Sequence, residues 1–146
     1  MSKLSAFLHP LVQEDQEVYI SKRFIKRDEN DEPVLDKDGK TIPVPFKIRP
    51  VKQEESDALT KQAKRVRTVN GVRQEYVDSE DFSTRMILLA TIEPNFSDSE
   101  LCAAYGVLDP MQVPKKMLLS GEYAALLKAI TALSGFDDDV EEEAKN

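Results

Sequence analysis

The sequence of 146 residues contains no tryptophan, one cysteine and one histidine. A single cysteine excludes a disulfide within the chain and a zinc site built from cysteines. The histidine, His9, stands beside Pro10, with no second histidine and no nearby nucleophile to complete a triad or a metal site. Cys102 lies beside two alanines and is best explained as a small packed thiol. We therefore predict no catalytic residue, no cofactor-binding residue and no metal ligand, and a protein that is not an enzyme.

Long apolar runs and clustered glycines are also missing. The longest apolar runs are only a few residues, such as residues 86–90, too short for a membrane-spanning helix. Residues 1–10 lack the apolar segment of a secretory signal, so we expect a cytoplasmic protein with no membrane partner. The five glycines are scattered through predicted turns, so the chain has no phosphate-binding loop and no dinucleotide fingerprint.

Positive charge is scarce in the second half of the chain. Residues 1–73 carry 15 Lys and Arg against 12 Asp and Glu, a net charge of +3, whereas residues 74–146 carry 5 against 15, a net charge of −10. An overall charge of −7 does not suit a general nucleic-acid binder, so we expect no nucleic-acid partner. Residues 137–146 (DDDVEEEAKN) hold clustered acids and no large apolar side chain, which predicts a disordered acidic tail.

Two stretches near the N-terminus alternate apolar and polar residues with the period of a strand. The first is residues 17–25; the second is residues 41–50, where Ile42, Val44, Phe46 and Ile48 share one face. Asp38-Gly39 marks a turn between them. Because proline cannot donate a hydrogen bond to a neighbouring strand, Pro43 and Pro45 predict that the second stretch is an edge strand. We expect a small antiparallel β-hairpin or meander over residues 17–49.

After Pro50 the apolar period changes to that of a helix. We expect helices over residues 53–67, 79–93, 97–106 and 117–136. The last is the most strongly marked, with Tyr123, Leu126, Leu127, Ile130 and Leu133 on one stripe and Gly135 at its end. The predicted fold class is α+β but mainly α: the hairpin lies against a bundle of about four or five helices, in one domain over residues 1–136 with the helical region at 53–136.

One basic cluster stands out from the otherwise mixed charges. Lys61, Lys64, Arg65 and Arg67 lie at the predicted end of the helix over residues 53–67, followed by Arg73. A solvated helix face explains this cluster. The functional alternative is electrostatic contact with an acidic partner, for which the acidic tail of another copy is one candidate. No aromatic residue interleaves with these bases, which argues against RNA or DNA.

Several segments together resemble one known family. These are AFLHP at the N-terminus, VYISKRF and VPFKIRPV in the predicted strands, and AAYGV, KKMLLSGEY and SGF between residues 101 and 136. They resemble the XkdN-like tail assembly chaperones of tailed bacteriophages, prophages and phage-tail-like bacteriocins. The resemblance spans most of the chain and is most specific at residues 115–123. Residues 28–40 form a longer, more acidic connection than we associate with the family.

The resemblance implies a non-enzymatic factor in the host bacterial cytoplasm that is absent from the finished particle. Such a factor binds the tape-measure protein, a long helical chain with apolar stripes, and keeps it soluble while tail tube subunits polymerise around it. Our candidates for the partner-binding residues are those around the start of the last helix: Met111, Val113, Lys115, Lys116, Met117, Leu118 and Tyr123. Methionines would make such a surface adaptable. Ordinary core packing is the alternative explanation for the apolar members.

Further partners follow from the same resemblance: the tail tube protein, a second copy of the chain, and a longer form of the chain made by programmed frameshifting. Residues 144–146 could be encoded by a slippery heptamer, although a chance tripeptide is the better explanation because degenerate codons make such matches common. Two other function classes stay open, which are a phage-encoded regulatory or anti-host adaptor and a minor structural component of the tail.

Overall fold

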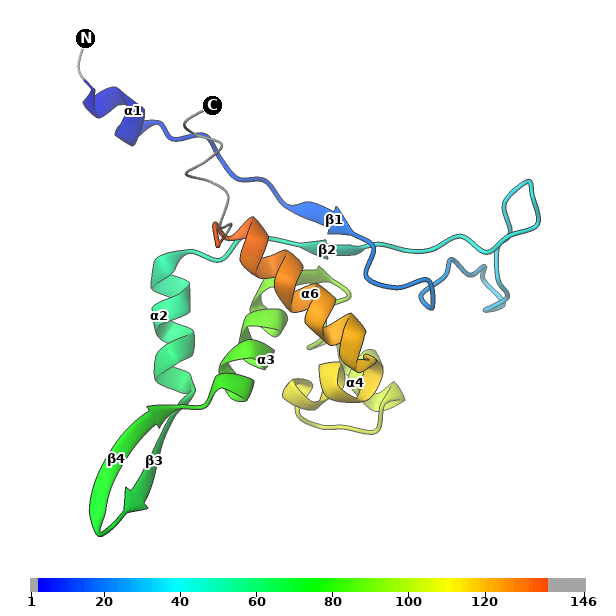
Figure 1. The fold of residues 1–146 in the computed structure, drawn as a ribbon. Coiled ribbons are helices and arrows are strands. Elements are labelled where there is room, and N and C mark those ends of the chain that lie inside the picture. Colours follow the sequence, from blue (N-terminus) through cyan, green and yellow to red (C-terminus); the bar gives the residue numbers. More distant parts are fainter. Residues whose placement is uncertain (1–2, 137–146) are drawn as a thin grey trace.

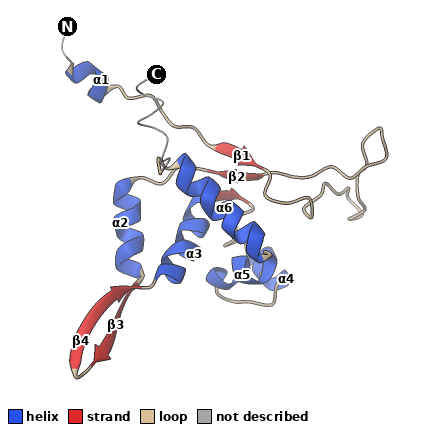
Figure 2. Cartoon of the chain, in the orientation of Figure 1, coloured by secondary structure: helices blue, strands red, loops and turns tan. Residues whose placement is uncertain are grey.

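The computed structural model describes residues 3–136, so the predicted acidic tail and the frameshift tripeptide lie outside the described residues. Figure 1 shows the arrangement of the elements, and Figure 2 distinguishes helices from strands. In chain order the elements are α1 (Leu4–Leu8), β1 (Gln16–Val18), β2 (Phe46–Ile48), α2 (Gln53–Gln62), β3 (Lys64–Val69), β4 (Val72–Val77), α3 (Ser79–Ala90), β5 (Thr91–Glu93), α4 (Ser99–Ala104), the 3₁₀ turn η1 (Pro110–Gln112), α5 (Val113–Met117) and α6 (Ser120–Leu133).

The prediction of a mainly helical bundle behind an N-terminal hairpin was wrong. The part of the chain that the structure describes has six α-helices and five strands. Helical residues, the 3₁₀ turn included, make up 41% of it, and residues in strands or isolated bridges make up 20%. The strands form two sheets spread along the chain, a three-stranded sheet of order β1-β2-β5 and a two-stranded sheet of β3 and β4. Three of the five strands, β3, β4 and β5, lie in the region 53–136, in which we expected helices and turns but no strand.

The three-stranded sheet brings together segments that are far apart in the sequence. Residues 16–18 and 91–93 both pair antiparallel with β2, which makes β2 the central strand. The prediction of an edge strand was therefore wrong. Its premise failed because Pro43 and Pro45 precede the strand, so that no residue of β2 itself lacks an N–H group.

The core lies between this sheet and the helices behind it. Phe46 and Ile48 of β2 are buried, as the alternation predicted, whereas Val44 is exposed because it precedes the strand. The buried apolar residues form one cluster, contributed mainly by β2, α3 and α6: Phe46, Ile48, Leu59, Met86, Ile87, Ala90, Phe96, Cys102, Val113, Leu118, Leu126 and Ile130. Cys102 is thus a packed thiol, as predicted.

The helix predicted over residues 53–67 ends at Gln62, and a β-hairpin follows it. Asn70 and Gly71 form the predicted turn, and both have positive φ, 52° and 78°, as a type I′ hairpin turn requires. Valines on both sides of the turn and Thr68 before it favour strands, and Val69 pairs with Val72. The resulting β3–β4 hairpin projects from the body of the molecule (Figure 1).

The helix predicted within residues 117–136 is α6, and it begins at Ser120 and not at Met117. α5 ends at Met117, the backbone is extended at Leu118 and Leu119, and α6 begins at Ser120. Of the predicted stripe, Leu126 and Ile130 are completely buried, and the other three residues are partly buried against the core. Gly135 follows α6 with φ of 99°, as predicted. No helix within residues 3–136 is long and apolar enough to cross a bilayer.

Candidate partner-binding surface

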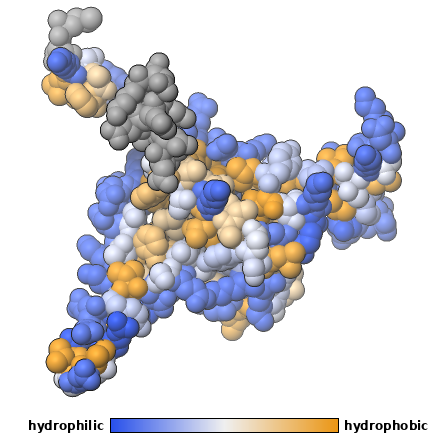
Figure 3. Space-filling view, viewed as in Figure 1, coloured by the Kyte–Doolittle hydropathy of each residue, from blue (hydrophilic) through white to orange (hydrophobic). Residues whose placement is uncertain are grey.

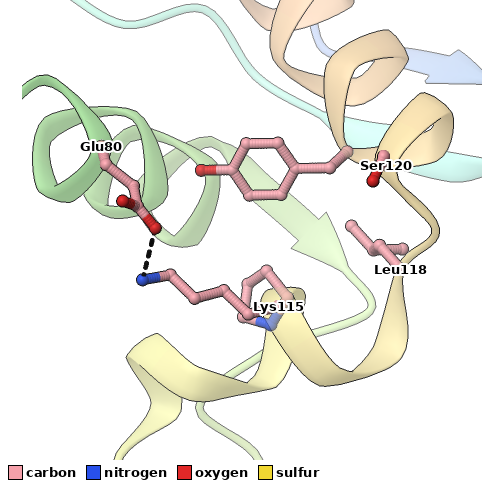
Figure 4. Close-up of a pocket in the computed structure, with 6 residues that line it drawn as sticks. Glu80, Lys115, Leu118 and Ser120 are labelled. Atoms are coloured by element: carbon pink, nitrogen blue, oxygen red, sulfur yellow. Dashed lines mark ion pairs between the residues drawn. The ribbon is translucent and has the colours of Figure 1, made fainter.

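A pocket of about 400 Å³ lies at the junction of α5 and α6, beside the start of α3 (Figure 4). Its lining residues come from three elements and the connection between two of them: Glu80, Pro114, Lys115, Leu118, Ser120 and Tyr123. The extended backbone at residues 118–119 changes the chain direction and allows α5 and α6 to present their side chains to the same space. The pocket therefore depends on the extended residues that separate α5 from α6.

Polar contacts hold two sides of the pocket in place. Lys115 Nζ lies 3.0 Å from Glu80 Oε1, and this hydrogen bond raises the pKa of Lys115 (Figure 4). Both side chains are well exposed, so the ion pair contributes little to stability and can open readily. The Tyr123 hydroxyl lies 2.8 Å from Thr84 Oγ1, which fixes the tyrosine ring against α3. The pocket combines an apolar lining with a charged rim, an arrangement suited to the side chains of a protein partner.

The structure brings together three of the seven residues that we predicted to bind a partner, namely Lys115, Leu118 and Tyr123. Lys116 is exposed, and Met111 and Met117 are partly buried. Val113 is completely buried, and Leu118, although it lines the pocket, is buried in the core cluster, so core packing applies to both. Contact of these residues with a partner remains a prediction. Glu80 belongs to the same pocket and was missed, because it lies on α3 and no local pattern connects it to residues 115–123.

Glu122 connects the start of α6 to the segment that follows β1. Arg23 donates from Nε to Glu122 Oε2 at 2.8 Å and from Nη2 to Oε1 at 2.6 Å, while the Leu119 N–H donates to Oε1 at 2.8 Å. The hydrogen bonds from Arg23 lower the pKa of the buried Glu122 carboxyl to about 2, outweighing the effect of burial. Arg23 also donates to the Met117 carbonyl at 3.1 Å. The sequence reading missed Arg23.

The predicted basic cluster does not occupy one helix face. Lys61 lies in the last turn of α2, whereas Lys64, Arg65 and Arg67 lie on β3. Arg65 pairs with Asp81 of α3 at 3.2 Å, and the guanidinium of Arg67 lies 4.8 Å from the centre of the Tyr76 ring. Two of these bases are thus engaged within the chain. Electrostatic contact with a partner remains a prediction for this cluster.

Comparison with known proteins identifies the family. The model of the Phage XkdN-like tail assembly chaperone protein family matches residues 4–145. Two proteins of Bacillus subtilis strain 168, the Phage-like element PBSX protein XkdN and the uncharacterized protein YqbN, are each 38% identical over 138 residues, covering 91% of this chain and 85% of theirs. A crystal structure of YqbN superposes with a TM-score of 0.66 at 33% identity, covering 94% of this chain and 99% of that one. The chain therefore belongs to the XkdN-like family of phage tail assembly chaperones, as the sequence motifs indicated.

Proposed function

We propose that this chain binds the tape-measure protein through the pocket at the α5–α6 junction and keeps it soluble while the tail tube polymerises. Family membership supports a role in tail assembly. The observation that supports a binding role for this surface is the convergence of Lys115, Leu118 and Tyr123 on one apolar, charge-rimmed pocket. The proposal includes a non-catalytic action in the host cytoplasm and release before the particle is complete.

The chemistry of the pocket suits a helical partner that must later be released. A tape-measure helix presents apolar side chains at intervals of three or four residues, and one or two of these fit a pocket of about 400 Å³. Leu119, between two lining residues in the chain, exposes 58% of its surface and is an exposed apolar side chain at the α5–α6 junction. The small size of this contact favours a weak, reversible complex over a permanent interface.

Co-expression tests the proposal. The tape-measure protein encoded in the same genome should be soluble when produced with this chain and should aggregate without it. Leu119→Asp places a charge at the α5–α6 junction without removing a buried side chain, and we expect it to lower the soluble fraction of the tape-measure protein at least about fivefold. Leu35→Asp is the matched control, because Leu35 is similarly exposed, at 54%, but belongs to the loop that follows β1.

Three outcomes would contradict the proposal. The first is a tape-measure protein that stays soluble without this chain, and the second is an equal effect of the two leucine substitutions. The third is recovery of this chain at stoichiometric amounts from purified particles, which would favour a structural tail component. Co-purification of the tail tube protein in the same experiment would add it as a second partner.

A further inference from the structure

The β3–β4 hairpin leaves both of its edges open. It pairs with no third strand among residues 3–136, and every residue of β4 is exposed. It projects beyond the helices, and apolar surface is visible near its tip (Figures 1 and 3). An isolated two-stranded ribbon is only marginally stable, and an open strand edge is a template for another strand. The hairpin is therefore open to pairing with a strand of another chain.

The turn determines which backbone groups are available. In a two-residue hairpin the residues that flank the turn, here Val69 and Val72, form a hydrogen-bonded pair, and bonded and non-bonded pairs then alternate along the strands. Gln74 and Tyr76 consequently direct their N–H and C=O groups towards β3. Arg73, Glu75 and Val77 direct theirs outward, away from β3. A strand added to β4 must pair with these three residues.

We propose that a second copy of this chain pairs its β4 with this β4, antiparallel about a two-fold axis at Gln74. Arg73 then lies opposite the partner's Glu75, and by symmetry Glu75 lies opposite the partner's Arg73. Both residues have outward-facing backbone groups, so each of the two pairs exchanges two backbone hydrogen bonds. The result is a continuous four-stranded sheet of order β3-β4-β4-β3 with opposite charges facing each other at its centre.

Other registers of β4 against itself lack this complementarity. An axis at Arg73 places two arginines opposite each other, and an axis at Glu75 places two glutamates opposite each other. An axis at Tyr76 leaves both charged residues without an opposite charge. Like charges directly opposite each other destabilise a strand pair, so charge selects the register centred on Gln74.

The edge of β3 does not offer a comparable pairing. If β3 paired antiparallel with β3 of a second copy, an axis at Arg65, Val66 or Arg67 would in each case place arginine side chains opposite one another. In addition, Arg65 is already paired with Asp81. The two edges of the hairpin therefore differ in charge pattern, and only β4 is suited to pairing with its own copy.

The proposed pairing also covers apolar surface that is now exposed. Val72, with 59% of its surface exposed, lies opposite the partner's Tyr76, and Tyr76 itself, 37% exposed, lies opposite the partner's Val72. The Arg67 guanidinium over the Tyr76 ring supports the ring on the same face of the sheet. Because the shared surface is one short strand per copy, the dimer should be weak and concentration-dependent.

A cysteine at the axis tests the geometry. Gln74 faces the partner's Gln74 in a non-hydrogen-bonded pair, where the separation of Cα atoms suits a disulfide. In the full chain, Gln74→Cys should form a disulfide-linked dimer under mild oxidation. Val66→Cys, on the exposed β3 edge, should not form such a dimer. The wild-type chain, whose single cysteine Cys102 is buried, gives the background level of disulfide-linked dimer. Equal linking by the two introduced cysteines would contradict the pairing.

Charge exchange tests the register independently. Arg73→Glu and Glu75→Arg each place like charges opposite each other, and either should weaken the dimer about tenfold in sedimentation velocity over a concentration series. The double variant restores opposite charges and should dimerise to within about threefold of wild type. A double variant as weak as the single variants, or a chain that is monomeric at every concentration, would overturn the proposal.

Two further results would assign the edge to another occupant. If residues 137–146 of another copy bound this hairpin, their deletion would abolish dimerisation, and Glu75→Arg would strengthen it. If the tape-measure protein were the occupant, replacing residues 66–75 with Asn-Gly would abolish its solubilisation while the chain alone stayed monomeric. Under our proposal the same replacement removes dimerisation, because only a stub of the hairpin remains.

Discussion

Glu55 and Glu122 occupy the same position, the third residue, of their helices α2 and α6. Each accepts a hydrogen bond from the backbone N–H three residues earlier, at Lys52 and at Leu119, and so performs half of a capping box. Neither helix begins with a serine, threonine or aspartate cap. The glutamate therefore replaces the missing cap, and a guanidinium from the sheet side of the molecule holds it: Arg49 for Glu55 and Arg23 for Glu122.

We expect Glu122→Gln to destabilise the chain in a pH-dependent way. The Glu122 pKa of about 2 lies below the ordinary value of 4.5, so the ionised carboxylate stabilises the fold above pH 4.5, and this contribution is lost as the pH falls towards 2. The variant should melt about 3–8 °C below wild type between pH 5 and 7. The difference should shrink as the pH is lowered to 3 and below. Thermal unfolding followed by circular dichroism measures the melting temperatures of the variant and of wild type at each pH.

Glu100→Gln is the control for this substitution, since Glu100 is an exposed first-turn residue of the short helix α4. It should change the melting temperature little at either pH. A difference between Glu122→Gln and wild type that is as large at pH 3 as at pH 7 would mean that the side chain acts through packing and not through its charge.

At the scale of elements, the side chains in the apolar stripe of α6 differ in burial, and therefore in how much each stabilises the fold. Ile130 is completely buried, whereas Leu133, one turn later, is only partly buried. Ile130→Ala should therefore lower the free energy of unfolding by about 2–5 kcal/mol, and Leu133→Ala by about half as much or less. Urea unfolding of the two variants measures the difference. Equal losses would show that the end of α6 packs more tightly than its exposure indicates.

Local patterns predicted the elements whose partners are close in the sequence. The stripe and closing glycine of α6 and the Asn70-Gly71 turn were predicted correctly, because each depends on a few neighbouring residues. Val66 fits the helical stripe of residues 53–67 equally well, so the pattern alone could not end α2 at Gln62. Pairing with β4 determines that residues 64–69 form a strand. β5 is similar: only three residues long, it exists through pairing with β2.

The residues of the candidate site also differ in whether their partners are close in the sequence. Lys115, Leu118 and Tyr123 lie within nine residues of one another, so the family motif could identify them as a group. Glu80 and Arg23 come from other elements, and only the packing of α3 and of the segment after β1 brings them to this region. Arg23 is nevertheless part of VYISKRF, and Glu122 is part of KKMLLSGEY. The ion pair thus joins two of the segments on which the resemblance rested.

At the scale of the whole molecule, a packed body carries three projections: the N-terminal arm with α1, the loop between β1 and β2, and the β3–β4 hairpin (Figures 1 and 2). The body is made of the β1-β2-β5 sheet and the helices that pack on it. No residue of α1 is buried. This exposure of the arm, residues 3–15, favours docking on a partner over docking on the domain.

The arm gives the last prediction. Phe7, Leu8, Leu11 and Val12 expose between 63% and 99% of their surface, which would be unfavourable in water unless a partner covers them. Because β1 begins only at Gln16, deletion of residues 2–12 should leave the core intact and change the melting temperature by less than about 2 °C.

The same deletion should reduce the soluble fraction of the co-expressed tape-measure protein by about threefold or more, because it removes apolar contact area. A full-length variant with Phe7, Leu8, Leu11 and Val12 all changed to serine is the control for chain length and should have the same effect as the deletion. If the deletion instead lowered the melting temperature by many degrees, the arm would belong to the fold of the domain. A deletion with normal stability and normal solubilisation would confine the partner surface to the body and the hairpin.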